Sequence, residues 1–141
     1  MEYYMKGRIK DKIEEIENYL NELSKIKPEN FELYKKDFKT KTACERYIEK
    51  IIEAVVDLAF LVIKDKGLEL PEDDNKAFET LAKADIIDEI SVKKLIEAKG
   101  MRNIVAHQYG QVDDKIIFNA VTKEIEADVN EFIIQIKKIN P

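Results

Sequence analysis

The sequence predicts an all-α protein, an antiparallel bundle of four to five helices joined by short loops. Apolar residues recur at steps of three and four along several stretches, the spacing that places them on one side of an α-helix. No stretch alternates apolar and polar residues as a strand would. The 141 residues are 45% hydrophobic and 38% charged, with only four glycines. This composition is typical of one charged helical domain, which we expect to cover residues 1–141.

Two long helices are predicted in the N-terminal half. The first covers roughly residues 5–26, where five apolar residues form one stripe. The second begins near Thr42, where Glu45 completes a capping box, and runs to about Asp65. Its apolar residues occupy more than one face, with Phe60 almost opposite the centre of the main stripe. We therefore expect this helix to be covered on more than one side.

Shorter helices and one last long helix complete the bundle. The segment ENFELYKK predicts a short helical turn between the first two helices. Another short helix is predicted over about residues 75–84, and Ser91 is the expected N-cap of the next helix. After a turn around GQVDD, the last helix runs to about Lys138 with a long apolar stripe.

Signals for export, membrane insertion and metal binding are missing from the sequence. The N-terminal residues contain no uninterrupted apolar run, and no window approaches about eighteen uncharged apolar residues. The single cysteine, Cys44, excludes an internal disulfide and fits a reducing compartment. One histidine and one cysteine, far apart in sequence, argue against a zinc site. We expect a cytoplasmic protein with no membrane partner, no metal and no cofactor.

The residues able to carry chemistry gather in GMRNIVAHQYG, residues 100–110. Metal-independent cleavage of RNA needs a group that moves the proton of the 2′-hydroxyl or of the leaving 5′-oxygen, and a cation for the phosphoryl oxygens. His107 suits the first task, because both of its protonation states are accessible near neutral pH. Arg102 suits the second, because its planar fork stays charged and matches phosphate. Asn103 can orient the histidine or donate to a phosphate oxygen.

The helical spacing separates two of these residues. On an ideal helix Arg102 and His107 lie about 140° apart, whereas Asn103 and His107 share a face. Three arrangements could bring Arg102 and His107 together. The long arginine side chain could bend towards the histidine, the helix could end before His107, or a second copy of the helix could pair with it across a two-fold axis. We favour the homodimer, because Gly100 is costly within a helix unless two backbones approach closely there.

Positive charge is concentrated around the motif, although the net charge of the chain is −5. We expect the lysines to contact RNA phosphates, which dominate the affinity of proteins for nucleic acids. Over residues 91–110 the charged side chains are one acidic residue, Glu97, and four basic residues, Lys93, Lys94, Lys99 and Arg102.

The string R-N-I-V-A-H-Q-Y-G-Q-V-D, residues 102–113, resembles the signature of HEPN domains, an arginine and a histidine separated by four to six residues. It is most similar to the HepT branch, the toxin half of a two-gene system whose partner is a minimal nucleotidyltransferase antitoxin, MntA. The resemblance implies a helical bundle that dimerises through the motif, with Arg102 and His107 forming a composite ribonuclease site that Asn103 assists. It also implies that the partner adds AMP to Tyr109 and thereby silences the toxin.

Two other interpretations stay open at this point. The chain could be a non-catalytic HEPN binding module that docks a nucleotidyltransferase or a nucleotide, with apolar surface around Val56 and Phe60 available to a partner. It could also be a helical scaffold in which Arg102, Asn103 and His107 form salt bridges or caps within one subunit. We favour the endoribonuclease toxin, acting on RNA as a homodimer.

Overall fold

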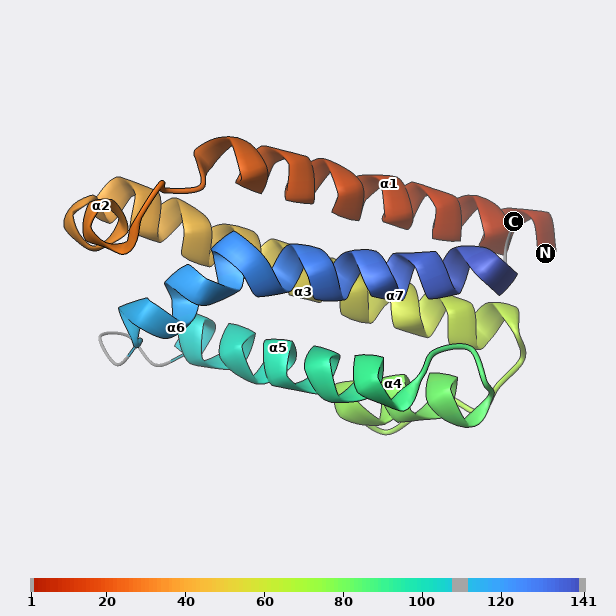
Figure 1. Cartoon of the computed structure of the whole chain (residues 1–141). Helices are drawn as coiled ribbons and strands as arrows, with labels where there is room; N and C mark the ends of the chain where they lie inside the picture. Colours follow the sequence, from red (N-terminus) through yellow and green to blue (C-terminus); the bar gives the residue numbers. More distant parts are fainter. Residues whose placement is uncertain (1, 108–111, 140–141) are drawn as a thin grey trace.

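The computed structural model describes residues 2–107 and 112–139, with side chains from Lys6 onwards. All regular elements in these residues are helical and none is a strand, which confirms the predicted all-α bundle (Figure 1). None of the described helices is both long enough and apolar enough to cross a membrane. The α-helices are α1 (Glu2–Ile26), α2 (Phe31–Lys36), α3 (Phe38–Asp65), α4 (Asp74–Lys83), α5 (Glu89–His107), α6 (Asp114–Asn119) and α7 (Ile125–Ile139).

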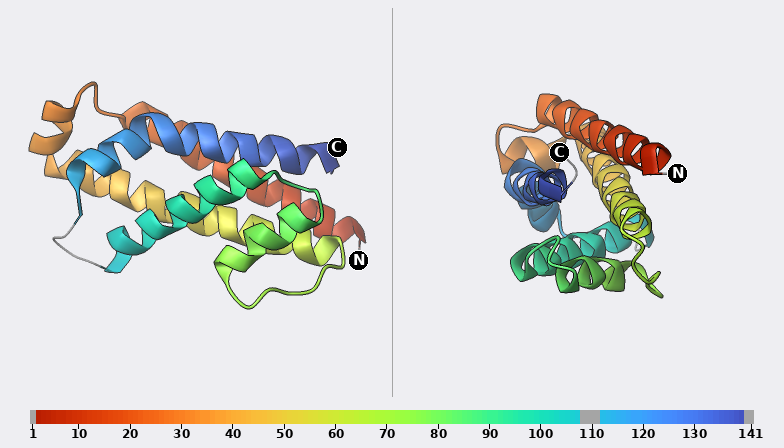
Figure 2. Two further views of the ribbon diagram at one scale, coloured as in Figure 1. Left: turned by 60° about the horizontal axis from the view of Figure 1, so that its bottom comes forward. Right: turned by 90° about the vertical axis from the view of Figure 1, so that its right-hand side faces the viewer.

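Helix α3 is the centre of the bundle and contacts α1, α2, α4, α5 and α7. Viewed along the bundle, α1 lies on one side and the α4–α5 layer on the other, with α3 and α7 between them (Figure 2). The expected cover on several sides of α3 is therefore confirmed. Val56 is buried and Phe60 packs half-buried against the core. The prediction that these residues offer apolar surface to a partner is wrong for Val56, which the chain itself covers, whereas Phe60 stays partly exposed.

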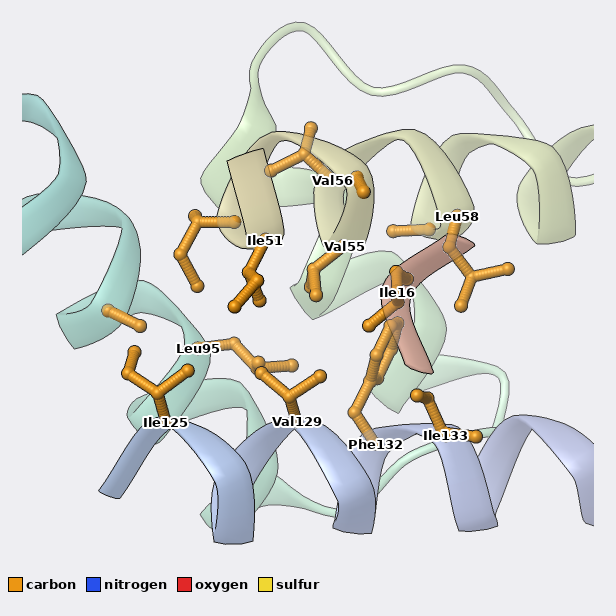
Figure 3. Close-up of a cluster of buried hydrophobic side chains, with 14 of the residues drawn as sticks. Ile16, Ile51, Val55, Val56, Leu58, Leu95, Ile125, Val129, Phe132 and Ile133 are labelled. Carbon is orange, nitrogen blue, oxygen red and sulfur yellow. The ribbon is translucent and has the colours of Figure 1, made fainter. Parts of the chain in front are cut away.

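The core fixes the position of α5, the helix that carries the motif. Leu95 of α5 points towards Ile51 of α3 and Val129 of α7, and all three are buried (Figure 3). Nearby, the rings of Phe78 on α4 and Phe132 on α7 meet edge to face with centroids 6.1 Å apart. Each large apolar side chain buried in this way contributes about 1.5–3 kcal/mol to stability. The motif helix thus packs against α3, α4 and α7.

Helix α3 begins earlier than the sequence predicted. It starts at Phe38 and not near Thr42. The Asp37 carboxylate accepts hydrogen bonds from the backbone N–H groups of Lys39 and Thr40 at 3.0 and 3.3 Å and so acts as the N-cap. An aspartate is a stronger cap than the threonine five residues later would be, and it adds a full turn to the helix.

Helix α5 also begins earlier, at Glu89. The Asp88 carboxylate accepts from the backbone N–H of Ser91 at 2.7 Å, so Asp88 caps the helix and the prediction of Ser91 as N-cap is wrong. Ser91 is buried instead, and its hydroxyl oxygen accepts a hydrogen bond from Gln135 on α7.

The last predicted helix is interrupted. A π-helical segment, Ala120–Glu124, separates α6 from α7. Its wider turn shifts the apolar stripe relative to a regular helix, so that both halves face the core. The Thr122 hydroxyl donates to the backbone carbonyl of Phe118 at 2.6 Å, one of the side-chain contacts that disturb regular helix pairing. The steps of three and four in the sequence fit either geometry, which is why the interruption was not predicted. The predicted short helices correspond to α2 and α4.

Candidate functional site

Helix α5 remains regular up to His107, its last residue. This excludes the idea that the helix ends before the histidine. Leu95 and Arg102 are seven residues apart, about two turns, so Arg102 continues the inner line of α5 towards α3 and α4. Asn103 and His107 lie on a different, outer side. Within one chain the helix therefore keeps the arginine and the histidine apart, as their spacing predicted.

Arg102 reaches into the junction of α3, α4 and α5. Its guanidinium nitrogen Nη1 lies 3.8 Å from Oε1 of Glu53 on α3, and Nη2 lies 3.8 Å from Oδ2 of Asp74 at the start of α4. Only 16% of the arginine side chain is exposed, whereas both carboxylates reach solvent. The scaffold interpretation predicted local salt bridges for this residue, and in Arg102 they are present.

These two ion pairs leave the hydrogen-bonding capacity of Arg102 unused. A guanidinium has five N–H donors, and both contacts are too long to be hydrogen bonds. The Nε atom is buried without a partner among the described residues. Long ion pairs to solvent-exposed carboxylates contribute at most about 1 kcal/mol each, whereas a phosphate could accept two short hydrogen bonds from the same fork. Arg102 is thus partly desolvated, held in place and still able to bind an anion.

Asn103 and His107 belong to the outer face of α5. His107 is exposed and Asn103 is half-buried, and neither side chain has a hydrogen-bond or ion-pair partner in the described part of the chain. On the same face Ile104 is 40% exposed, and a Cβ placed on Gly100 would meet no atom within 4 Å. This face combines an ionisable group, an exposed isoleucine and a smooth backbone, as a helix-to-helix contact needs.

The three lysines predicted to contact RNA differ in their surroundings. Lys93 is exposed and Lys99 is half-buried, and neither has a charged partner within the described residues. Lys94 is exposed, but its Nζ lies 3.6 Å from Oδ1 of Asp128 on α7. Its charge is therefore partly compensated within the chain, which leaves Lys93 and Lys99 as the freer cations on α5.

Tyr109, the residue expected to be modified, lies outside the described residues. Within the described ranges no group of three or more histidine, cysteine, aspartate or glutamate side chains is placed to hold a metal ion. Cys44 is buried, and burial raises the pKa of its thiol to about 11. The thiol is thus protonated at neutral pH and is not available as a nucleophile.

No pattern in the sequence directly indicated Glu53 and Asp74 as neighbours of Arg102. Glu53 stands alone on an otherwise apolar turn of α3, between Ile52 and Ala54, which are both buried. An isolated carboxylate in such a run is the one signal that could have suggested a charged partner nearby. Asp74, the first residue of α4, directly follows other acidic residues in the sequence, and nothing local distinguishes it.

The bundle and its Arg-Asn-x-x-x-His helix together define a HEPN-type helical domain. A model of the family described as HepT-like ribonuclease matches residues 9–138. The match covers nearly the whole chain, and the chain therefore belongs to this family.

Known proteins resemble the chain in sequence and in fold. An Archaeoglobus fulgidus protein is 32% identical over 88 residues, and the alignment spans 62% of this chain and 65% of that relative. The tRNA nuclease HepT of Aphanizomenon flos-aquae is 22% identical over 94% of both chains. The mRNA nuclease HepT of Shewanella oneidensis is 27% identical over 74% of this chain and 77% of that protein.

One solved structure shows a similar fold bound to a partner. The tri-AMPylated HEPN toxin of Shewanella oneidensis, in complex with an MNT antitoxin, has a TM-score of 0.84 and 25% identity. The match covers 92% of this chain and 96% of the toxin.

Proposed function

We propose that this chain is the toxin of a HEPN and nucleotidyltransferase toxin–antitoxin pair, a metal-independent endoribonuclease whose site forms between two copies of the chain. The observation that carries the proposal is the placement of Arg102, Asn103 and His107 on one regular helix of a HepT-like bundle. The proposed setting is the cytoplasm, which suits the single unpaired thiol of Cys44.

The proposed reaction uses the nucleophile that RNA itself carries. A His107 imidazole takes the proton of the 2′-hydroxyl while the O2′–P bond forms, and the same imidazole, now protonated, donates that proton to the 5′-oxygen as the P–O5′ bond breaks. Arg102 and Asn103 donate to the phosphoryl oxygens, where negative charge accumulates. The products are a 2′,3′-cyclic phosphate and a 5′-hydroxyl end. No group beyond these side chains is needed to balance the protons.

A second copy of the chain explains how the separated residues act together. In one chain His107 lies on the outer face of α5 while Arg102 points inwards to Glu53 and Asp74. Two α5 helices related by a two-fold axis bring the outer faces together around Gly100 and gather both histidines there, and an Arg102 that leaves its two long ion pairs can turn towards the partner's histidine. The open space at Gly100 and the exposed Ile104 support this arrangement.

Regulation by the partner enzyme is part of the proposal. AMP on Tyr109 places a bulky group and a negative phosphate two residues from His107. The added phosphate competes with RNA for Arg102, and its bulk blocks the approach of a strand. The S. oneidensis structure supports this role, since that HEPN toxin is AMPylated and bound to its antitoxin.

Cleavage of RNA in the presence of EDTA tests the proposed activity. The wild type, Arg102→Ala and His107→Ala are compared on tRNA and mRNA, after the mass and the dimeric state of each protein have been checked. We expect the wild type to leave 2′,3′-cyclic phosphate ends and each variant to lose at least about 10²-fold in rate. Equal rates for the wild type and His107→Ala would remove the histidine from the mechanism.

Subunit mixing tests where the site is formed. Arg102→Ala and His107→Ala are unfolded together, refolded and assayed. If each site uses the arginine of one protomer and the histidine of its partner, the mixed dimers contain one intact site, and about a quarter of the wild-type activity returns. If both residues act from the same chain, no mixture recovers activity.

A second candidate function is a binding module that docks the nucleotidyltransferase or a nucleotide without cutting RNA. The ion pairs that occupy Arg102 within the chain favour it. Intact-mass analysis after incubation with the partner and ATP tests this function, with Tyr109→Phe as the control. AMP addition to the wild type alone, together with no cleavage of any RNA, would make this the main role.

A further inference from the structure

A second surface suited to RNA lies around α2, at the end of the bundle opposite the two chain termini (Figure 1). An open pocket of about 740 Å³ lies between the end of α1, α2 and the first turn of α3. Its apolar lining includes Leu33, which is 51% exposed, and Phe38, which is 73% exposed. A phenylalanine ring exposed to this extent is left without the burial that aromatic side chains normally have.

Three lysines line the pocket, of which Lys27 pairs with Glu126 on α7 at 2.7 Å. Residues 25–41 contain six lysines and three acidic residues, although acidic residues outnumber basic ones in the chain as a whole. Lys36 and Lys39 line the pocket near Phe38, and neither forms an ion pair in the described part of the chain, although the charge of Lys39 acts on the neighbouring Asp37 carboxylate. The carboxylate of Asp37 between them is occupied by hydrogen bonds from the Lys39 and Thr40 backbones and the Thr40 hydroxyl.

Rings and lysines continue from the pocket towards the motif. The rings of Phe31 on α2 and Phe118 on α6 have centroids 5.6 Å apart. The Nζ of Lys115 on α6 lies 4.6 Å from the centroid of Phe31. Helix α6 starts seven residues after His107, so the chain spans at most about 25 Å between them. The lysine-bearing end of α6 thus connects the α2 region with the end of the motif helix.

We propose that the α2 surface, defined as Leu33, Lys36, Phe38 and Lys39 together with Lys115, binds a single-stranded stretch of the RNA that is cut at Arg102 and His107. A base stacks on the Phe38 ring, and the lysines pair with the flanking phosphates. The inference rests on the proposed function. It assigns the substrate class as RNA with an unpaired segment next to the bond that is cut.

The arrangement of charges favours RNA over a protein helix as the occupant. Proteins that bind single strands combine a lysine-lined groove with aromatic rings on which bases stack. A partner helix would cover Phe38 and Leu33 with its apolar face, but it would also have to place carboxylates opposite both Lys36 and Lys39. RNA supplies a flat ring and regularly spaced negative charges in one chain.

Binding of 2′-O-methyl oligoribonucleotides, measured by fluorescence anisotropy, tests the inference. These probes lack the attacking hydroxyl and cannot be cut, so affinity is measured separately from cleavage. On a probe of about 20 nucleotides we expect Phe38→Ala to bind about five- to a hundredfold more weakly. For Lys36→Gln with Lys39→Gln, the slope of log affinity against log salt should fall by about 1.4. A probe of about four nucleotides is too short to span both sites, so the variants and the wild type should bind it with nearly the same affinity.

A matched control changes two exposed lysines at the other end of the bundle, Lys10→Gln with Lys138→Gln, and should leave the salt slope unchanged. Because every altered side chain is exposed, thermal unfolding should be unaffected in all variants. If Phe38→Ala and the double lysine variant both bind RNA as tightly as the wild type does, the inference is overturned. The proposed function still stands in that case if Arg102→Ala abolishes cleavage. Loss of nucleotidyltransferase binding with unchanged RNA affinity also overturns it and makes the occupant a protein. Failure of the wild type to bind or cut any RNA refutes the proposed function itself.

Discussion

Gln135 joins the start of the motif helix to α7 and offers a direct test of how α5 is held. The side chain is almost fully buried, with 7% exposed. Its Oε1 accepts from the backbone N–H of Asp88 at 2.8 Å. Its Nε2 lies within hydrogen-bonding distance of Asp88 Oδ2, Ser91 Oγ and Glu131 Oε1, at 3.1, 3.1 and 3.0 Å. One amide therefore supports the residue that caps α5 and the buried serine behind it.

The substitution Gln135→Ala removes these contacts without changing the fold class. The carboxylates of Asp88 and Glu131 belong to exposed residues, so water replaces their lost hydrogen bonds. The Ser91 hydroxyl is buried and the Asp88 N–H is partly covered, and these two groups lose partners that water replaces poorly. At about 1–1.5 kcal/mol for each, the free energy of unfolding should fall by about 2–3 kcal/mol. For a domain of this size the melting temperature should fall by about 8 °C.

Urea and thermal unfolding, followed by circular dichroism, measure this change. The control is Glu131→Ala on the same helix, which removes an exposed partner of the same amide and should cost less than about 0.5 kcal/mol. If Gln135→Ala were as stable as that control, the polar cluster would contribute nothing and α5 would be held by apolar packing alone.

Three further predictions follow from the local environment of charged and thiol groups. The double substitution Glu53→Gln with Asp74→Asn should lower the free energy of unfolding by less than about 1 kcal/mol. Because Arg102 is released, the variant should bind 2′-O-methyl RNA up to about fivefold more tightly. Weaker binding would mean that the two carboxylates position the arginine. Burial raises the pKa of Cys44 to about 11, so a thiol reagent at about pH 8 should label this residue only when the protein is unfolded in urea. Equal labelling rates in the folded and the unfolded protein would contradict the burial of Cys44. Hydrogen bonds from the Thr40 hydroxyl and nearby amides lower the pKa of Asp37 from 3.8, so its stabilisation is complete above that pH and is lost as the pH falls below it. Asp37→Asn should therefore reduce the loss of stability measured between about pH 5 and pH 2, and an unchanged profile would show that other carboxylates dominate.

Most of the fold followed from periodicity. The stripes of apolar residues predicted the long helices, because a helix stays in place only when one side is buried. The starts of α3 and α5 were less accurate, since a capping residue is chosen among several candidates by contacts elsewhere. Asp88 caps α5 while Ser91 turns inwards to Gln135, a residue on a helix more than forty positions away. The local sequence around Asp88 and Ser91 therefore does not show which of the two residues caps the helix.

For the candidate site too, some features could be predicted from the sequence and others could not. The types of side chain and their order on one helix were readable from the sequence, and so was the separation of Arg102 from His107. The environment of Arg102 was not, because Glu53 and Asp74 come from two other helices. The compensation of Lys94 by Asp128 on α7 is a further contact between distant parts of the chain.

The sequence by itself determined the helical class, the approximate lengths of the long helices and the set of groups that can handle a phosphodiester. These properties depend on residue type and on spacing along one helix, both of which are local. Tertiary structure alone decided that α3 is enclosed, that α7 is preceded by a π turn, and that Arg102 is partly desolvated between two carboxylates. It also placed the exposed Phe38 ring beside Lys36 and Lys39 at the pocket next to α2. Burial and charge pairing are set by what packs nearby in space, and the packing partners here come from helices far apart in sequence.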